Sequence, residues 1–549
     1  MCIINKIVDK LLTKAIKFLI NMFIILGGQN MNIELKEILL KEVEEFREPA
    51  YKFLNGEINR AQFKKASGKM GVYSHRDGKN FMVRLRTTAG VIAADKLEFI
   101  YNLAKKHNLD SIHMTTRQTI QLHGVSIDSA CDILKESIEF GICTRGVGGD
   151  NPGNIVMTAL TGVKPGEAFD IVPYAFAIDN NIQRQVTSYN LPRKLKINLS
   201  SDIEDRVHVR AADLGFLAVK DGDKNKFKVF VGGGIGRNPR LALELENLIN
   251  PEDIVYYVEA MTNLFVAEGD YNNHGKARVR YIVARMGEEE FIKCYNKHLK
   301  EVFEKYGDSL KFKADTKEIT KSGIKTDKKS FRLVEQKQDG LYSVYVKPIG
   351  GQFKTSDLEK VLNAIEGMKD IEVRLTTTEG FYIINLNGEE AEKMLAVTES
   401  MTGKTRLEDS VSCVGVPICQ MGVMGSQLLL NEILTYFKEN NVTEDILPRL
   451  AISGCPNSCA VHELAPIGFA GKMKRVDGVM QNAFELHIGG KFAIEKTKFG
   501  NHIGEILQVK IPEYLMEIAM ELKKENTEFE DWFISNEEKF QAITSKYLV

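Results

Sequence analysis

Residues 81–90, FMVRLRTTAG, align with residues 342–351, YSVYVKPIGG, at an offset of 261 positions. The same offset pairs residues 112–118 with residues 373–379. In each copy, alternating apolar residues predict a strand before and after a segment with helical periodicity. The helical segments are 94–106 and 355–368. The chain therefore contains two copies of a small α+β unit.

A second pair of repeats alternates with these units. Residues 191–196, LPRKLK, align with residues 447–452, LPRLAI, at an offset of 256 positions. Glycine pairs within 231–233 and 488–490 follow in the same order. The order A–B–A′–B′ indicates a tandem duplication. Its halves are expected to pack with approximate twofold symmetry around a shared crevice, the default place for a ligand site.

The two larger repeats, B and B′, differ in their polar residues. B carries Lys194 and Lys196, and B′ carries a group of cysteines. At the offset of 256, the counterparts of the two lysines are Leu450 and Ile452, and the counterparts of the cysteines at 455 and 459 are Leu199 and Ile203. This alignment predicts that cations and metal-binding thiols are divided between the halves.

The composition is that of a globular protein with several domains. Of the 549 residues, 44% are hydrophobic and 27% are charged, and no long Pro-, Gly- or Ser-rich segment separates the repeats. The formal net charge is -1, so no global field attracts nucleic acid or an anionic membrane. Any affinity for anions must therefore come from local groups.

The first thirty residues resemble a translated leader more than part of a domain. Their apolar stretch, residues 18–26, is too short to span a bilayer, and no small-residue cleavage site follows it. Gly27 and Gly28, whose codons can spell a ribosome-binding site, precede Met31 and a charged helical pattern. We expect residues 1–30 to be a mis-assigned leader and residues 31–70 to form an N-terminal helical arm.

Four of the eight cysteines are grouped in the C-terminal part of the chain. Cys413 and Cys419 form a C-x5-C pair, and Cys455 and Cys459 form a C-x3-C pair. Four thiolates can hold one metal centre. Structural zinc prefers spacings of about two to four residues, whereas iron–sulfur clusters accept varied spacings. The pattern favours a cluster over zinc, and four buried apolar cysteines are a weaker alternative.

The cysteine pattern also carries a family resemblance. A C-x5-C pair followed by residues 454–459, GCPNSC, resembles the siroheme-containing sulfite and nitrite reductases, and the likeness covers most of residues 70–545. The resemblance implies that the four cysteines hold a [4Fe–4S] cluster and that Cys459 also bridges to the siroheme iron.

The resemblance implies an α+β fold. It consists of tandem-duplicated ferredoxin-like half-domains and two larger α/β siroheme and iron–sulfur domains, related by a pseudo-twofold axis. The half-domains are expected at residues 71–140 and 331–402, the siroheme and substrate domain at 141–330, and the [4Fe–4S] and siroheme domain at 403–549.

A small oxyanion needs fixed positive charge, and the resemblance identifies candidate cations. Arg84, Lys194 and Lys196 stand in the contexts of the family's substrate-binding residues. The chain departs from the family in the segment DNPGN, where Gly153 replaces an expected arginine. Arg145 is the expected substitute for that missing cation.

The resemblance also implies residues that bind the many carboxylates of siroheme. They are Thr115, Arg117, Gln121, Arg193 and Asn457. Many relatives have an arginine two positions before Thr115, where this chain has His113, so one cofactor contact is expected to be weaker. The glycine turn 232–236 and the basic segment 276–280, KARVR, are less specific candidates. The first is equally an ordinary turn, and the second is equally a surface strand.

The function implied is the six-electron reduction of sulfite to sulfide, and the Lys-x-Lys pattern favours sulfite. The alternatives are nitrite reduction to ammonia by the same site, an iron–sulfur electron-transfer subunit without oxyanion turnover, and a related cobalamin-pathway monooxygenase. The sequence shows no dinucleotide fingerprint or flavin domain, so a separate donor, ferredoxin or a flavoprotein, is expected. We expect a cytoplasmic enzyme without nucleic-acid or membrane partners.

Overall fold

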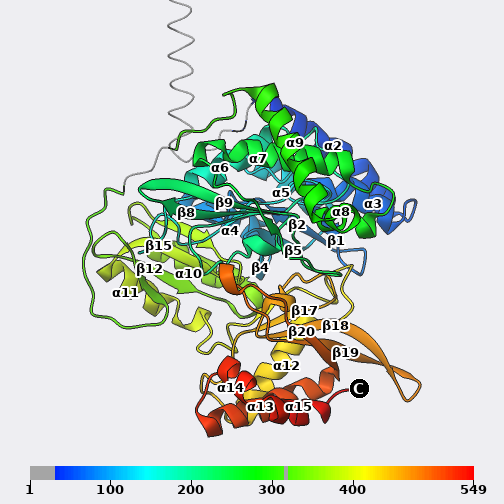
Figure 1. The fold of residues 1–549 in the computed structure, drawn as a ribbon. Coiled ribbons are helices and arrows are strands. Elements are labelled where there is room, and N and C mark those ends of the chain that lie inside the picture. The colour runs from blue at the N-terminus through cyan, green and yellow to red at the C-terminus, as the bar shows by residue number, and fades with distance from the viewer. Residues whose placement is uncertain (1–30, 32, 315–318) are drawn as a thin grey trace, which may run out of the picture.

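The computed structural model describes residues 31, 33–314 and 319–549 (Figure 1). The predicted leader, residues 1–30, lies outside these residues. Within them, helices and strands are both abundant, and the named strands form four sheets of five strands each. No helix in this part of the chain is long and apolar enough to cross a membrane.

The two small α+β units form a pair of sheets that exchange one strand each. The strands are β1 (Val72–Ser74), β2 (Phe81–Leu85), β3 (Val91–Ala93), β4 (Ser111–Met114), β5 (Ile120–Val125), β11 (Leu333–Glu335), β12 (Leu341–Val346), β13 (Gln352–Lys354), β14 (Glu372–Leu375) and β15 (Phe381–Asn387). The sheet orders are β1-β2-β5-β4-β13 and β11-β12-β15-β14-β3. β3 thus completes the sheet of the second copy, and β13 completes that of the first. The exchange ties the copies into one body.

Each exchanged strand leads directly into a helix. α4 (Ala94–Lys106) follows β3 and α10 (Thr355–Ile365) follows β13, and the two helices pack against each other. The prediction of a helix over 94–106 is confirmed, and the helix predicted over 355–368 ends at Ile365. Each copy ends with another helix, α5 (Ile127–Phe140) or α11 (Gly388–Val397).

The two larger units share one sheet topology. Their strands are β6 (Val156–Met157), β7 (Ile197–Ser200), β8 (Leu214–Asp221), β9 (Lys224–Val231) and β10 (Leu243–Glu244), and β16 (Val411–Ser412), β17 (Leu450–Ser453), β18 (Ile467–Val476), β19 (Val479–Ile488) and β20 (Asn501–Leu507). In each sheet the first three strands pair in parallel and the last two pairings are antiparallel. The order A–B–A′–B′ is therefore present in the structure.

Strand pairing corrects the alignment of the two larger units. Ile197 opens β7 opposite Leu214, and Leu450 opens β17 opposite Ile467. These equivalent pairs differ by 253 positions, so the offset of 256 was wrong by three residues. The Leu-Pro-Arg match lies before the strands, where sheet hydrogen bonds do not fix the register.

The corrected register changes the predicted counterparts. The counterparts of Lys194 and Lys196 are Leu447 and Arg449, and those of the cysteines at 455 and 459 are Asp202 and Arg206. The cysteines at 455 and 459 therefore have no cysteine counterparts in the first half. The division of cations is incomplete, because Arg449 keeps a positive charge at one of the two positions.

Equivalent contacts join each small unit to the larger unit of the other half. Thr116 Oγ1 donates to the carbonyl of Cys459 at 2.7 Å, and Thr377 Oγ1 donates to the carbonyl of Arg206 at 2.7 Å. Thr377 lies 261 positions after Thr116, and Cys459 lies 253 positions after Arg206. The contacts are thus related by the pseudo-twofold axis, and one of them ends at the cysteine loop.

Helices cover the outer faces of the large sheets (Figure 1). The helices are α6 (Val172–Arg184), α7 (Ile254–Glu268), α8 (Val279–Met286) and α9 (Glu288–Tyr306) in the first unit, and α12 (Ser426–Glu439), α13 (Ile511–Glu525), α14 (Phe529–Ser535) and α15 (Glu537–Ser545) in the second. Each set packs into a separate apolar core with its sheet. The opposite sheet faces, the first small sheet and the loop of Cys459 meet between the units, and we call this region the crevice.

The predicted N-terminal arm contains two helices. α2 (Ile33–Leu54) buries Leu39, Val43, Phe46 and Ala50, a spacing of four, three and four residues that forms one helix face. This face packs on α5 of the first small unit. α3 (Arg60–Ser67) begins with a capping box at Asn59.

Candidate functional site

Two thiol loops leave neighbouring parallel strands. Cys413 directly follows β16, and Gly454 and Cys455 directly follow β17. Because the carboxyl ends of parallel strands meet at one edge of a sheet, the two cysteine pairs are brought together. Cys413 N donates to Ile452 O at 3.2 Å, and Gly454 N donates to Cys413 Sγ at 3.2 Å.

Glycine is required at two positions of these loops. Gly415 has φ of 53°, and a Cβ there would lie 2.5 Å from Ser426 Oγ. A Cβ on Gly454 would lie 2.6 Å from Met424 O. The glycine before Cys455 in the GCPNSC motif therefore allows close packing of the two loops.

The four thiols form one electrostatic group. Burial raises the pKa of Cys413, Cys419 and Cys455, the last to about 11, and in each case the Cys459 thiol is the second cause. Cys459 itself is exposed. Neighbouring thiolates repel one another unless a cation binds them, and an all-sulfur donor set suits iron or zinc, not hard cations.

Strand alternation turns lysines toward the thiol loops. Ile197 and Leu199 of β7 belong to the core beneath α6 and α7. Successive side chains of a strand point to opposite faces, so Lys196 and, two positions earlier, Lys194 point to the crevice. The thiol of Cys459 opposes the fall in the pKa of both lysines, which places them near the cysteine loop.

Asp213 is the fully buried carboxylate that contacts this basic group. It accepts hydrogen bonds from Lys196 N at 2.7 Å and from Arg278 Nη2 and Nε at 2.6 and 3.3 Å. Asp213 is 0% exposed, and the side chain of Arg278 is 9% exposed. One negative charge is thus buried among several positive charges.

The basic residues lower one another's pKa. Burial is the largest cause of the fall in the pKa of Lys194 to about 8, and Arg278 and Arg84 lower it further. Burial, Lys194, Arg278 and Arg117 hold the pKa of Lys196 well below its usual range. An anion bound here would relieve this repulsion.

Arg117 joins the group from the turn between β4 and β5. Its Nη2 donates to Asn154 O at 2.8 Å, and its Nη1 donates to Asn198 Oδ1. Burial lowers its pKa to about 9, with Arg278 as a further cause. Asn154 in turn donates to the carbonyl of Arg117 at 3.1 Å, so the predicted cofactor residue is held rigidly.

Arg84 and Gln121 lie opposite each other on the crevice face of the first small sheet. They are direct partners in the pairing of β2 with β5. In the amide orientation that satisfies every group, Gln121 Oε1 accepts from Arg84 Nη2 at 2.7 Å and from Arg84 Nε at 3.1 Å. The guanidinium lies 5.7 Å from the ring centroid of Tyr73. A predicted substrate residue and a predicted cofactor residue are therefore in direct contact.

Other predicted cofactor residues lie at the edge of the crevice. Arg193 forms an ion pair with Asp150 at 2.8 Å, and Asp150 also contacts His274 Nε2 at 3.1 Å. Asn457 is exposed in the thiol loop and donates to Cys455 Sγ at 3.4 Å.

Thr115 has a local contact. Its Oγ1 accepts from the backbone of Arg117 and Thr119 at 3.3 and 3.1 Å, and so it holds the Arg117 turn.

The structure does not bring Arg145 to the other predicted cations. Its Nε donates to Glu42 of α2 at 2.9 Å, and its side chain is 8% exposed. The predicted role as a substitute for the missing arginine therefore requires this buried ion pair to break.

The two departures from the family pattern have visible consequences. A Cβ on Gly153 would have one neighbour within 4 Å, Leu195 O at 3.9 Å, so a side chain has room beside Lys194 and Lys196. His113 is buried and contacts Gln352 at 3.2 Å, and burial lowers its pKa to about 3. It is therefore neutral and supplies no positive charge at this position.

The less specific candidates also have defined places. Gly236 N donates to Glu463 Oε1 at 2.9 Å and thereby joins the two halves. The interpretation of 276–280 as a surface strand was wrong, because α8 begins at Val279 and both Arg278 and Arg280 are buried. The alternating basic residues of KARVR suggested a strand, although the apolar residues that follow form one face of helix α8.

Asp213, Asn154 and Asn198 were missed by the sequence analysis. Asp213 stands between apolar residues and looks like the polar residue before an ordinary strand. Asn154 and Asn198 look like ordinary polar residues of a loop and of a strand. The strand alternation that points Lys196 to the crevice also points Asn198 there, so Asn198 could have been predicted from the sequence.

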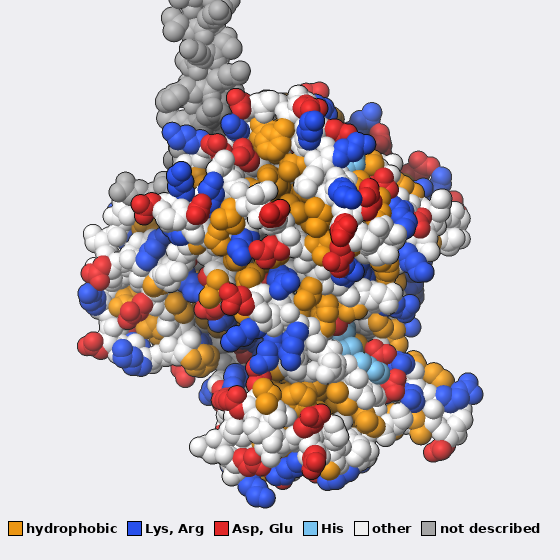
Figure 2. Space-filling model, viewed as in Figure 1, with side chains coloured by type: hydrophobic (Ala, Val, Ile, Leu, Met, Phe, Trp, Pro, Cys, Tyr) orange, Lys and Arg blue, Asp and Glu red, His pale blue; other side chains and the backbone are white. Residues whose placement is uncertain are grey.

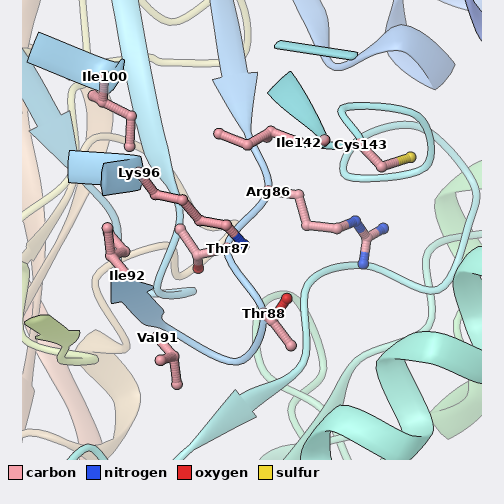
Figure 3. A pocket seen from close by; sticks show the side chains of 10 residues that line it. Arg86, Thr87, Thr88, Val91, Ile92, Lys96, Ile100, Ile142 and Cys143 are labelled. Atoms are coloured by element: carbon pink, nitrogen blue, oxygen red, sulfur yellow. The ribbon is translucent and has the colours of Figure 1, made fainter. Parts of the chain in front are cut away.

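A small pocket lies elsewhere in the first small unit. Arg86, Thr87, Thr88 and Lys96 are among its lining residues, and Figure 3 shows Lys96 reaching toward Thr87 while Arg86 extends the other way. Arg86 is already paired with Asp179 at 2.8 Å, and both side chains are almost fully buried. Lys96 is a second cation that lines this pocket, and burial lowers its pKa.

The crevice fits an anionic cofactor and an anionic substrate. Its basic side chains are Arg84, Arg117, Lys194, Lys196 and Arg278. Among the described residues, two buried acids lie near them: Asp213, which is hydrogen-bonded to Arg278, and Glu463, which interacts with Lys196. The Nη1 atom of Arg280 and the Nδ1 atom of His208 are also buried without a hydrogen-bond partner in the described chain. Figure 2 shows Lys and Arg side chains gathered where the upper body meets the lobe of α12–α15.

Two family models match this chain. Residues 73–139 and 334–400 match the nitrite/sulfite reductase ferredoxin-like half domain. Residues 148–303 match the nitrite and sulphite reductase 4Fe-4S domain. Together the matches cover more than half of the chain, and the second falls on the first large unit, whose fold the cysteine-bearing unit repeats.

This chain is similar both to proteins named as sulfite reductases and to proteins named as nitrite reductases. The "Sulfite reductase [ferredoxin] 1" of Mycolicibacterium paratuberculosis is 24% identical over 484 residues, covering 84% of this chain and 83% of the relative. The chloroplastic ferredoxin–nitrite reductase of Zea mays is 26% identical over 457 residues, covering 80% and 77%. The Mycobacterium tuberculosis NirA structure has a TM-score of 0.75 and 21% identity, covers 94% of this chain and 98% of that one, and supports the fold.

Proposed function

The chain belongs to the nitrite and sulphite reductase family, and we propose that it reduces sulfite to sulfide with six electrons. The cofactors of this family are siroheme and a [4Fe–4S] cluster. The observation that carries the proposal is the basic crevice beside the thiol loops, where five cations face two buried carboxylates, Asp213 and Glu463.

The thiol loops and the basic crevice are in contact. Thr116 Oγ1, one residue before Arg117, donates to the carbonyl of Cys459 at 2.7 Å. Gly236 of the first large unit contacts Glu463, four residues after Cys459. A cluster held by Cys413, Cys419, Cys455 and Cys459 would therefore adjoin the anion-binding residues, with Cys459 nearest to them.

The chain's own residues would bind the anion and supply protons. When bound, the cofactors supply the electrons and the iron at which the central atom of the anion is reduced. Arg84, Lys194 and Lys196 attract the negative oxygens, because their charges are incompletely balanced. With a pKa lowered to about 8, Lys194 Nζ can release a proton to an oxygen that leaves as water and regain it near neutral pH.

The siroheme carboxylates would be held by residues around the same crevice. We assign this role to Arg117, Thr115, Gln121, Arg193 and Asn457. Arg117 is fixed by Asn154 and Asn198, so it offers a preorganised charge. The neutral His113 supplies no charge, which leaves Arg117 as the cation of this turn.

Reduction of nitrite to ammonia is the second candidate. Gly153 leaves space in place of an expected cation, and a less positive pocket favours a singly charged anion over the doubly charged sulfite. Lys194 and Lys196 favour sulfite because both remain in the crevice. The relatives include named sulfite reductases and named nitrite reductases.

We propose ferredoxin as the electron donor. The similar proteins from Mycolicibacterium paratuberculosis and Zea mays are named for ferredoxin. The cytoplasmic location stays a prediction from the sequence.

Steady-state turnover with a reduced dye tests the proposal. The anaerobic holoenzyme is given sulfite or nitrite, and sulfide and ammonia are measured. The account predicts a higher kcat/KM for sulfite, and a loss on the order of 100-fold in Lys196→Met, the usual effect of removing one charge-stabilising donor. Lys220→Met, an exposed lysine of β8, is the matched control and should stay within about twofold.

The outcomes separate the candidates. A higher kcat/KM for nitrite would replace the sulfite assignment with the second candidate. Turnover of neither anion by protein that contains both cofactors would overturn both and favour an electron-transfer role.

A further inference from the structure

Two histidines and a glutamine line the crevice face beside Arg84. Val83 and Leu85 of β2 and Leu122 of β5 point into the apolar core. Arg84 and Gln121 therefore point to the crevice, and His123 shares the face of Gln121 because it lies two residues later. His123 is paired across the strands with Met82, next to the Arg84–Gln121 pair.

These side chains form a continuous hydrogen-bonded row. Arg84 donates twice to Gln121 Oε1, at 2.7 and 3.1 Å, and Gln121 Nε2 donates to His123 Nε2 at 2.9 Å. His123 Nδ1 lies 3.3 Å from His75 Nε2. Since His123 Nε2 accepts, its proton lies on Nδ1 and is donated to His75. Every donor in the row points outward from Arg84.

The direction of the row requires a neutral His123. Burial lowers the pKa of His123 well below its ordinary value, and His113, His75 and Arg84 lower it further. Burial also lowers the pKa of His75, against a smaller opposing influence of Asp77.

The charged and titratable groups around His123 come from all neighbouring elements. They are His75 and Asp77 of the β1–β2 turn, Arg84 of β2, His113 of β4, and Lys347, which acts through His113. Lys347 in turn faces the buried carboxylate of Glu379. Burial and the nearby Arg84 therefore favour a neutral imidazole, and Nε2 remains an acceptor.

The outer end of the row is anchored on a cysteine loop. Gln420 Nε2 donates to Ser74 O at 2.6 Å, and Arg76 Nη1 donates to Gly422 O at 2.9 Å. These contacts lie on either side of His75 in the sequence. The turn that carries His75 is thus fixed to the loop that follows Cys419.

We propose that His75 and His123 are positioning residues that act through Gln121 to hold the Arg84 guanidinium in the orientation that binds the substrate anion. This inference rests on the proposed function, because it takes Arg84 as a substrate-binding residue. An arginine side chain has many rotamers, and Gln121 fixes two of the three guanidinium nitrogens. The third, Nη1, makes only a long contact of 3.5 Å to Val147 O, with which a bound anion would compete. The row also links that orientation to the loop of Cys419.

A double-mutant cycle tests the inference. The oxidised holoenzyme is titrated with sulfite, and its dissociation constant is read from the change in the visible spectrum. His123→Leu removes the acceptor, and we expect affinity to fall on the order of fivefold, as for residues of one hydrogen-bond network. His123→Gln places an amide oxygen near Nε2 and should restore affinity to within about twofold.

The Arg84→Leu background distinguishes positioning from a general structural effect. If His123 acts through Arg84, His123→Leu should have almost no further effect in that background. KM for sulfite should rise while kcat changes little. His298→Leu on α9, where His298 pairs with Glu301 at 3.2 Å, is the control for loss of a partly buried histidine.

Two results would overturn the inference. One is an equal loss of affinity from His123→Leu with and without Arg84, and the other is no loss at all. If His123→Leu does not retain both cofactors, His75→Leu at the half-buried turn is used in the same cycle, with a smaller loss expected. Variants that turn over normally and bind sulfite normally would refute the positioning role of His75 and His123 and leave the proposed function intact. A wild-type protein without turnover would instead refute the proposed function.

Discussion

Replacing Asp213 by asparagine should strongly destabilise the protein. The carboxylate makes two short hydrogen bonds, at 2.6 Å to Arg278 and 2.7 Å to Lys196 N, and is 0% exposed. Hydrogen bonds to charged groups contribute about 1.5–3 kcal/mol each. Asparagine keeps the shape but removes the charge and leaves Arg278 buried without a counter-ion, so we expect a loss of about 3–5 kcal/mol in the free energy of unfolding.

Chemical denaturation followed by circular dichroism measures this loss. Asp221→Asn, at the exposed end of β8, is the matched control and should change the free energy by less than about 0.5 kcal/mol. The double variant Asp213→Asn with Arg278→Met removes both buried charges and should recover part of the loss. A loss below about 1 kcal/mol in Asp213→Asn, or a double variant as unstable as the sum of the single ones, would refute the reasoning.

Three further predictions concern the crevice. Lys194 is protonated below its pKa of about 8 and neutral above it, so the affinity for nitrite should fall by up to about tenfold per pH unit above pH 8. The Lys194→Arg variant stays charged, so its affinity in optical titrations should not change with pH. A parallel fall in both proteins would show that Lys194 does not cause the pH dependence. Gly153→Arg should lower the KM for sulfite by about tenfold, because the guanidinium adds a cation. The side chain has room, since a Cβ at this position has only Leu195 O within 4 Å, at 3.9 Å. An unchanged KM would show that position 153 does not face the substrate. Cys413→Ser should abolish the absorbance of the cluster, and retention of a full cluster would remove Cys413 from the ligand set.

The duplication and the small units were predictable because apolar residues recur at matching positions of the two copies. Alternation over 81–85 and 112–114, repeated 261 positions later, requires two similar sheets, and the helix over 94–106 was found at its observed limits. The exchange of β3 and β13 was not predictable, because a short edge strand fits either sheet equally well by its apolar pattern. The register error of three residues arose because the Leu-Pro-Arg match lies before β7 and β17, where no sheet pairing fixes the alignment.

The candidate site was only partly readable from the sequence. The cysteine spacing and the Lys194–Lys196 alternation identify residues that the fold brings to one crevice. Asp213 could not be found in this way, because a single carboxylate beside apolar residues has no distinguishing period. For Arg145 the sequence suggested a role that the structure does not support. Its charge suggested substrate binding, but its side chain points to Glu42, a partner far away in the sequence.

Cofactor content per chain tests the central claim most directly, namely that one crevice shared by the two halves holds both a cluster and siroheme. Iron, acid-labile sulfide and extracted siroheme are measured in anaerobically purified protein. The account predicts four cluster irons with equal labile sulfide, plus one siroheme with its own iron, and loss of the cluster in Cys455→Ser. Zinc in place of iron, or a full cluster with no siroheme bands, would contradict it.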